Sequence, residues 1–205
     1  MTKKLGNWLR TLNGYGIKLK SLRSKSGRQR LLWGIVILWF ASVLVALFWL
    51  LDARLSWFDN QGRLQQQVSH GEVEERLKPL LERTVGDLSA VVVHVFSEDC
   101  PCNWRTRSHQ QLIQRRVTER AGRNVELDID QHEALKAYIP STPAVIIFDD
   151  NEQLIYLGPY ADGAFCNTES SFVEALLPQL SAGTAAPKGG WINTVAKGCY
   201  CAVAI

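Results

Sequence analysis

Residues 88–104 read LSAVVVHVFSEDCPCNW, and this stretch decides the fold class. Its first part, Leu88–Phe96, is almost continuously apolar and rich in β-branched valine, which is typical of a strand buried on both faces. Polar residues and two cysteines interrupt the pattern at Asp99–Asn103, and a helical pattern follows over Trp104–Ala121. The stretch therefore predicts a buried strand that leads, through a turn carrying two cysteines, into a helix.

The chain on either side of this stretch alternates helices and strands. Apolar spacing predicts a helix over Glu72–Arg83, in which Pro79 favours a kink or a split. After the central stretch the patterns predict a strand, a short helix, a two-stranded hairpin and a closing helix: Asn124–Asp130, Gln131–Ile139, Ala144–Phe148 with Gln153–Leu157, and Glu169–Leu180. Strands joined through helices are parallel, and a hairpin adds an antiparallel edge. We expect an α/β fold with a central mixed sheet flanked by helices.

An apolar segment precedes this domain. Residues 31–51 read LLWGIVILWFASVLVALFWLL, without a charge, Asn, Gln or Pro. A helix of this length spans roughly 30 Å, the thickness of the hydrocarbon core of a bilayer. A buried core helix is usually shorter and has a polar face. A cleaved signal peptide has an apolar region of about 7–15 residues followed by small residues, whereas Trp49 and Leu50 stand at that place here. We expect a single, uncleaved transmembrane helix.

Charge is distributed unevenly around this segment. Residues 1–30 contain nine Lys or Arg and no Asp or Glu, whereas residues 52–205 contain fourteen Lys or Arg and twenty Asp or Glu. The positive-inside rule places the N-terminus in the cytoplasm and the acidic body outside the inner membrane, in the periplasm of a Gram-negative bacterium. Aromatic residues suit the two membrane interfaces: Trp33 at one end, and Trp49, Trp57 and Phe58 at the other. The acidic body argues against nucleic acid as a partner.

The predicted organisation has five parts: a basic cytoplasmic tail at 1–30, the transmembrane helix at 31–51, a polar stalk at 52–71, the α/β domain at 72–181 and a cysteine-containing tail at 182–205. The last part begins in the small-residue linker 181–190. We expect this tail to lie outside the core, so that removing 196–205 leaves the domain folded.

All five cysteines follow the apolar segment, on the side where an oxidising compartment permits disulfides. Cys100 and Cys102 form one Cys-x-Cys sequence, named here the helix pair, and Cys199 and Cys201 form a second, named the tail pair. Their matching spacing and the glycine-rich linker suggest that the two pairs meet in space. Cys166 makes the count odd, so at least one thiol is free or paired transiently.

The order of these motifs resembles the thioredoxin superfamily. A buried strand ends in Phe96, Cys100-Pro101-Cys102 begins a helix, and Ser141-Thr142-Pro143 precedes the next strand. The resemblance covers residues 72–181 and, with the Gly-Cys-Tyr-Cys near the C-terminus, extends to uncharacterised membrane-anchored thioredoxin-like proteins of bacterial envelopes. It implies a thioredoxin-like fold, with redox cysteines at a helix start opposite a cis-proline loop. The helix pair departs from the family, because its spacer is one residue instead of two and the Trp-Cys-Gly-Pro-Cys signature is absent.

The resemblance implies a thiol–disulfide oxidoreductase that uses no cofactor and acts on envelope proteins bearing thiols or disulfides. By analogy with the first cysteine of the family, Cys100 is the nucleophile and Cys102 resolves the mixed disulfide. Thr142 and Pro143 shape the substrate groove, where the backbone before the proline pairs with a substrate strand. The tail pair is a candidate relay to the helix pair by thiol–disulfide exchange, and Cys166 is a candidate third partner.

Other interpretations remain open from the residues alone. The helix pair can instead bridge elsewhere, for instance to the tail pair, as stable staples of a scaffold without the reaction. Four thiolates from two pairs can also bind Cu(I) or Zn²⁺, although the spacers are shorter than in structural zinc motifs. Ser97-x-x-Cys100 matches part of the peroxiredoxin pattern, but Val93 stands where that pattern has proline. His94 lies in the middle of a strand and is expected in the core.

Overall fold

The computed structural model describes residues 6–53, 55–181 and 189–205. The chain divides into two compact units, Met1–Asp52 and Ala53–Ile205.

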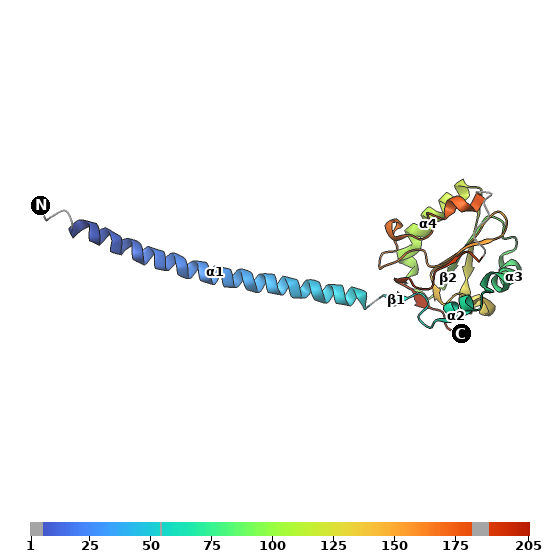
Figure 1. The fold of residues 1–205 in the computed structure, drawn as a ribbon, viewed down its shortest axis with the longest axis horizontal. Helices are drawn as coiled ribbons and strands as arrows, with labels where there is room; N and C mark the ends of the chain where they lie inside the picture. Colours follow the sequence, from blue (N-terminus) through green and yellow to red (C-terminus); the bar gives the residue numbers. More distant parts are fainter. Residues whose placement is uncertain (1–5, 54, 182–188) are drawn as a thin grey trace. The chain divides into compact units, whose positions relative to one another are not determined.

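Helix α1 (Gly6–Asp52) forms the described part of the first unit (Figure 1). Within it, Ser26–Leu50 is long and apolar enough to cross a membrane, and no other helix in the described part of the chain has this property. Its apolar side chains, such as Leu38 and Phe48, are exposed in the unit. Exposed apolar side chains along 25 residues suit a lipid environment better than water. A membrane-spanning helix near the predicted position is therefore consistent with the structure.

The second unit is built on a five-stranded mixed sheet with the order β3-β2-β5-β6-β7. In that order the strands span Arg123–Asp128, Val91–Phe96, Ala144–Phe148, Leu154–Gly158 and Trp191–Ile192. The outer pairs β3–β2 and β6–β7 are parallel, whereas β2–β5 and β5–β6 are antiparallel. The predicted mixed α/β sheet is confirmed, with its parallel pair joined through a helix and its antiparallel hairpin. The hairpin does not end the sheet, because β7 adds a further strand.

Helices cover both faces of this sheet. Helix α3 (Val73–Val85) packs on one face and α4 (Asn103–Glu119) on the other, as Figure 1 shows. Successive strand residues point to opposite faces, so Val93 joins the cluster under α3 and Val92 joins the cluster under α4. The central strand β2 is therefore buried on both faces, as its continuous apolar sequence predicts.

The segment expected to form a stalk folds into the second unit instead. It contains strand β1 (Ser56–Trp57) and helix α2 (Arg63–Ser69). Phe58 is fully buried in the core, because its ring packs edge-on against the ring of Tyr200 at a centroid distance of 5.5 Å. The expectation that Phe58 lies at the membrane interface is therefore wrong. Trp57 is 51% exposed, and its place at the membrane interface stays a prediction.

The first predicted helix, over Glu72–Arg83, is confirmed as α3, but it is neither split nor interrupted. Pro79 lies inside this continuous 13-residue helix. Its side chain is exposed, so the proline ring displaces no core contact. The loss of one backbone hydrogen bond at Pro79 is outweighed by the buried face of the helix, which includes Leu77 and Leu81.

Two later stretches that were predicted to be helices form only short 3-10 turns. Residues 129–135 form η1 (Ile129–Gln131) and η2 (Glu133–Leu135), where a helix over 131–139 was predicted. The stretch 169–180 forms η3 (Thr168–Ser170) and η4 (Leu177–Ser181) in place of a closing helix. Side chains compete with the helix here, because Ser171 Oγ accepts a hydrogen bond from the Val173 amide. Pro178 also lacks the N–H that a helix interior needs.

The C-terminal tail belongs to the core, contrary to the sequence prediction. Strand β8 (Lys197–Gly198) pairs with β1, and β9 (Cys201–Ala202) pairs with β4 (Ser141–Thr142), both antiparallel. Tyr200 and Val203 are only 7% and 5% exposed and join the main hydrophobic cluster. The tail is therefore a structural part of the second unit. The expectation that it lies outside the core is wrong, and we no longer expect the domain to stay folded when residues 196–205 are removed.

Candidate functional site

The helix pair lies where strand β2 turns into helix α4. The Cys100 amide donates to the Ser97 carbonyl over 3.1 Å, and the Asn103 amide donates to the Cys100 carbonyl over 3.1 Å. Cys102 is the N-cap residue of α4. The first turn of a helix has unpaired N–H groups and a partial positive charge, which stabilise a thiolate. The turn and the helix start therefore place both cysteines where thiolate chemistry is favoured.

Two disulfides join the helix pair to the tail pair. Cys100 is bonded to Cys201, and Cys102 to Cys199. In both disulfides the Cα atoms are 5.7 Å apart, inside the range that a disulfide requires. The two pairs therefore meet in space, as their spacing suggested. Neither pair is bridged within itself, so the pairing matches the cross-linked arrangement that the residues alone left open.

The tail strand lies beside the loop that contains Pro143. Cys201 is the register partner of Thr142 in the β4–β9 ladder. The Thr142–Pro143 peptide bond is cis, and Cys100 Sγ lies 3.6 Å from the Thr142 carbonyl oxygen. From the sequence, a substrate strand is expected to pair with the backbone before this proline. In this chain the protein's own tail pairs with that backbone.

Polar contacts hold the tail on both sides of the disulfides. Ser56 Oγ donates to the Tyr200 carbonyl over 3.0 Å. Arg63 Nη2 donates to the Val203 carbonyl over 2.6 Å and to the Pro140 carbonyl over 3.1 Å. The Tyr200 hydroxyl donates to a carbonyl in the loop after β6, and burial raises the pKa of this hydroxyl well above its ordinary value. The tail is therefore held by hydrogen bonds and packing as well as by the two cross-links.

Sequence reasoning missed Ser56, Arg63 and Tyr200 as residues that position the tail. For Tyr200 a signal was present in the alternation Cys199-Tyr200-Cys201. In an extended strand, residues two apart share a face and the residue between them points the other way. Two cysteines facing α4 therefore require Tyr200 to face the core. No comparable local pattern marks Ser56 or Arg63, because their partners lie 144 and 140 residues away.

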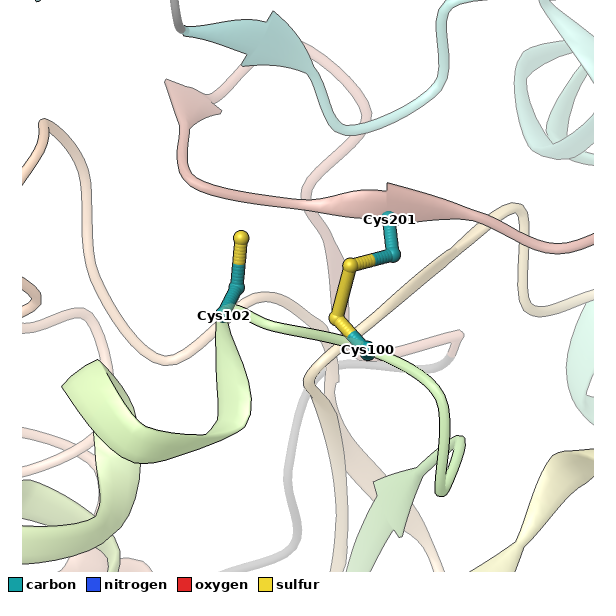
Figure 2. Close-up of side chains that lie close together, drawn as sticks. All are labelled: Cys100, Cys102 and Cys201. Carbon is teal, nitrogen blue, oxygen red and sulfur yellow. A yellow bond between two sulfur atoms is a disulfide. The ribbon is translucent and has the colours of Figure 1, made fainter.

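The two members of each disulfide differ in exposure. Cys100 and Cys102 are 5% and 6% exposed, whereas Cys199 and Cys201 are half-buried. Figure 2 shows the side chains of Cys100 and Cys102 pointing from the start of α4 toward the side on which the strand of Cys201 lies. The tail cysteines are therefore the more exposed residues of the two disulfides.

Cys166 is a buried free thiol outside both disulfides. Burial raises its pKa, although a hydrogen bond with Thr106 and the charge of Arg105 oppose the shift. A raised pKa keeps the thiol protonated and unreactive at neutral pH. Cys166 packs in the cluster under α4, and the candidate role as a third redox partner stays a prediction.

Three sulfur atoms of the site form a tight group. The Sγ atoms of Cys100, Cys102 and Cys201 all lie within 4.8 Å of one another, as the close-up in Figure 2 illustrates. Sulfurs this close can exchange disulfide partners, and after reduction they can also converge on one soft metal ion. The geometry is therefore compatible with a redox centre and with a metal–thiolate centre.

His94 lies in the core, as its position in the strand predicts. It is 1% exposed, and its ring nitrogens lie 2.6 Å from the Tyr160 hydroxyl and 3.0 Å from Asn124 Oδ1. Burial lowers the pKa of His94, while the bond to Asn124 and the charge of Glu126 oppose this shift. Every ring nitrogen has a polar neighbour, so a structural role accounts for this histidine.

Comparison with known proteins finds one family for this domain. The family model described as a domain of unknown function (DUF6436) matches residues 66–203, about two thirds of the chain. The match includes all five cysteines, β4 and β9. No curated protein and no solved structure matches the chain.

Proposed function

This chain belongs to the DUF6436 family, and we propose that it is a membrane-anchored thiol–disulfide oxidoreductase. Its helix pair and tail pair exchange disulfides with each other and with envelope proteins that bear thiols or disulfides. One observation carries the proposal: Cys201 sits in a strand that pairs with Thr142, and it is bonded to Cys100 at the start of a helix. This is the arrangement expected when a redox cysteine holds a strand-like substrate in a mixed disulfide.

A thioredoxin-like fold for the second unit is part of the proposal. Its support is the position of the site in the sheet: the helix pair follows the central strand β2 directly, and the Pro143 loop leads into the neighbouring strand β5. Helix α4 then covers one sheet face and α3 the other. The 3-10 turns η3 and η4, found in the described residues 168–181 in place of a closing α-helix, are a departure from the predicted pattern.

The chemistry of the site needs no group beyond the cysteines. In the oxidised state each of the two disulfides can accept two electrons from a partner dithiol. The partner loses two electrons and two protons and leaves with a disulfide of its own, while two thiols form in the site. Helix α4 favours this step because its N-terminus stabilises the thiolate form of the helix pair.

The proposed location is supported by α1 and by the charges around it. We place the N-terminus in the cytoplasm and the second unit in the periplasm, because the cationic residues precede the apolar stretch. An oxidising compartment agrees with two disulfides in the second unit. A reporter that is active only outside the cytoplasm, fused after Ile205, is expected to be active, and the full-length chain is expected to stay with membranes. An inactive reporter would reverse the proposed orientation.

Trapping of partners in cells tests the enzyme proposal. Cys102→Ser with Cys201→Ser leaves Cys100 and Cys199 without their partners, so reducible mixed disulfides with envelope proteins are expected to accumulate. Cys102→Ser with Cys199→Ser is the matched control, since it also removes two cysteines but leaves the Cys100–Cys201 disulfide intact. If neither variant forms mixed disulfides and both merely lose stability, the cysteines are staples of a scaffold.

A second candidate function is supported by the three clustered sulfurs. A reduced protein that binds Cu(I) or Zn²⁺ through Cys100, Cys102 and Cys201 would be a metal-handling protein instead of an oxidoreductase. The stoichiometry of metal bound to the fully reduced chain separates the two functions. A metal-handling protein is expected to bind one ion per chain and to lose it when Cys201 is replaced by serine, whereas the oxidoreductase proposal requires no bound metal.

A further inference from the structure

The two cross-links differ from an ordinary pair of staples in one respect: in each of them a buried cysteine is bonded to a half-buried one. The buried cysteine belongs to the helix pair and the half-buried one to the tail pair. A thiolate attacks a disulfide along the line of the S–S bond, at the sulfur that it can reach. An external thiolate therefore attacks Cys199 or Cys201, and the sulfur that leaves is Cys102 or Cys100.

The leaving sulfur is the better of the two leaving groups. Exchange is faster when the departing thiolate is stabilised, and the first turn of α4 stabilises a negative charge at the helix pair. Attack at a tail sulfur therefore releases a thiolate at the start of the helix.

The released thiolate faces the remaining disulfide. Cys102 Sγ lies within 4.8 Å of both sulfurs of the Cys100–Cys201 disulfide. The Cys100 backbone also forms a turn with Asn103, closed by the hydrogen bond of 3.1 Å. Residues two apart in such a turn have Cα atoms about 5–6 Å apart, which is inside the range for a disulfide. The Cα spacing of this turn and the short distance between the two sulfurs therefore permit a Cys100–Cys102 disulfide.

We propose that a single two-electron reduction opens both cross-links, by internal transfer of the second disulfide onto the helix pair. This inference rests on the proposed oxidoreductase function and specifies its reaction sequence. A partner dithiol first reduces the Cys102–Cys199 disulfide: its first thiolate attacks Cys199 and expels Cys102, and its second thiolate attacks the mixed disulfide and leaves Cys199 as a thiol. The partner has then lost two electrons and two protons and carries a disulfide.

The second step is an exchange without net electron transfer. The Cys102 thiolate attacks Cys100, the Cys100–Cys102 bond forms, and the Cys100–Cys201 bond breaks, so Cys201 leaves as a thiolate and takes up a proton. The product has one disulfide in the helix pair and two thiols in the tail pair. Reduction that starts at the Cys100–Cys201 disulfide gives the same product, because the released Cys100 thiolate then attacks Cys102 and expels Cys199.

The consequence is a division of roles between the two pairs. The tail pair meets external thiols and becomes the accessible dithiol, while the helix pair keeps the stored disulfide at a buried position. The tail strand stays seated through Tyr200, Ser56 and Arg63, whose contacts do not involve sulfur. Because the strand stays in place, its two thiols remain close enough to the helix pair for the reverse exchange, in which they attack the Cys100–Cys102 disulfide.

Replacement of Cys199 by serine tests the internal transfer without any reductant. In Cys199→Ser full-length protein, purified in detergent, Cys102 has lost its partner and is poised to attack Cys100. After incubation at mildly alkaline pH, acid quenching, alkylation and disulfide mapping, we expect most molecules to contain a Cys100–Cys102 disulfide and an alkylated Cys201. A majority with the Cys100–Cys201 disulfide intact and Cys102 alkylated would overturn the inference.

A matched experiment on the unaltered chain covers the case in which the variant does not fold. One molar equivalent of dithiothreitol is added to the native full-length protein, and the products are mapped in the same way. We expect a predominant species with alkylated Cys199 and Cys201 and a Cys100–Cys102 disulfide. Two results would overturn the two-electron sequence while leaving the oxidoreductase proposal intact. One is a species that keeps either cross-link and carries the two thiols of the other. The second is a mixture of fully reduced and fully oxidised molecules. Cross-links that open only in denaturant would overturn both.

Discussion

The β2–α4 region and the C-terminal tail contribute equal numbers of cysteines to one site, but they are built in different ways. Strand β2, the turn and α4 are contiguous in sequence and form a local unit. The tail reaches the same place through β-pairing with β1 and β4 and through disulfides with sequence separations of 101 and 97 residues. The comparison shows that the arrangement of the four cysteines depends on the C-terminal tail, the region in which the local sequence predicts the least structure.

The largest expected effect comes from removing the tail. A chain that lacks residues 196–205 loses the buried side chains of Tyr200 and Val203 and both disulfides. Closing a loop of about 100 residues stabilises a fold by about 4–5 kcal/mol for the first disulfide and less for the second. We expect the truncated second unit to be largely unfolded by circular dichroism and proteolysis.

The matched control removes only Ala204 and Ile205, both of which are exposed. This shorter truncation is expected to leave the unfolding midpoint unchanged. A truncation at residue 196 that folds as well as this control would show that the tail is an accessory to the domain and would restore the prediction made from sequence.

The second effect isolates packing from cross-linking. Tyr200→Ala keeps both disulfides but removes a ring that packs against Phe58 and a buried hydroxyl. We expect a loss of about 3–5 kcal/mol in the free energy of unfolding, measured with denaturant. Trp57→Ala, at a half-exposed position on β1, is the control and is expected to cost under about 1 kcal/mol. Equal losses in the two variants would mean that the disulfides alone hold the tail.

A third substitution tests the hydrogen bonds from Arg63 that hold the tail. Arg63→Met removes hydrogen bonds to the carbonyls of Val203 and Pro140 but keeps a long apolar stem. The loss is expected to be about 1–3 kcal/mol, since both carbonyls lose a charged donor and only the Pro140 carbonyl keeps a second donor, the Val203 amide. Arg76→Met removes only an exposed ion pair with Glu72 and is expected to cost about 0–1 kcal/mol. A smaller loss in the free energy of unfolding for Arg63→Met than for Arg76→Met would show that the Arg63 hydrogen bonds do not hold the tail.

The smallest expected effect is the pH dependence of stability that His94, on strand β2 of the sheet, contributes. Burial lowers the pKa of His94 in the folded state below its ordinary value of about 6.5. The unfolded chain therefore binds a proton that the folded chain does not, and stability contributed by neutral His94 is lost as the pH falls through the unfolded value. We expect a lower unfolding midpoint at about pH 5.5 than at about pH 7.5, and a smaller difference in His94→Gln. An equal difference in both proteins would assign the pH dependence to other groups.

Local patterns were sufficient for the sheet region. The apolar run Leu88–Phe96 and the hairpin around Asp149–Glu152 encode their strands in neighbouring residues, and the structure forms β2, β5 and β6 there. The helix start at the helix pair could also be placed, because a helical period begins after Asn103. These predictions succeeded because each depends on contacts within one element or between adjacent elements.

Apart from the approach of the two cysteine pairs, the contacts over long sequence distances could not be predicted. Phe58 is read as a membrane-interface residue beside an apolar helix, and only the distant Tyr200 makes it a core residue. The closing helix fails because Pro178 and the serine side chains compete with a weak helical pattern. The pairing between the helix pair and the tail pair has several possible connectivities, and the sequence alone does not distinguish them.

The reduction potential of the two disulfides tests the central claim most directly. The full-length native chain is equilibrated with glutathione buffers of defined potential, quenched with acid, and its thiols are counted by mass-tag alkylation. An oxidoreductase is expected to show midpoints in the range of about −120 to −270 mV, where thiol–disulfide enzymes operate. Midpoints below about −300 mV for both cross-links, the range of structural disulfides, would contradict the account and identify the four cysteines as staples.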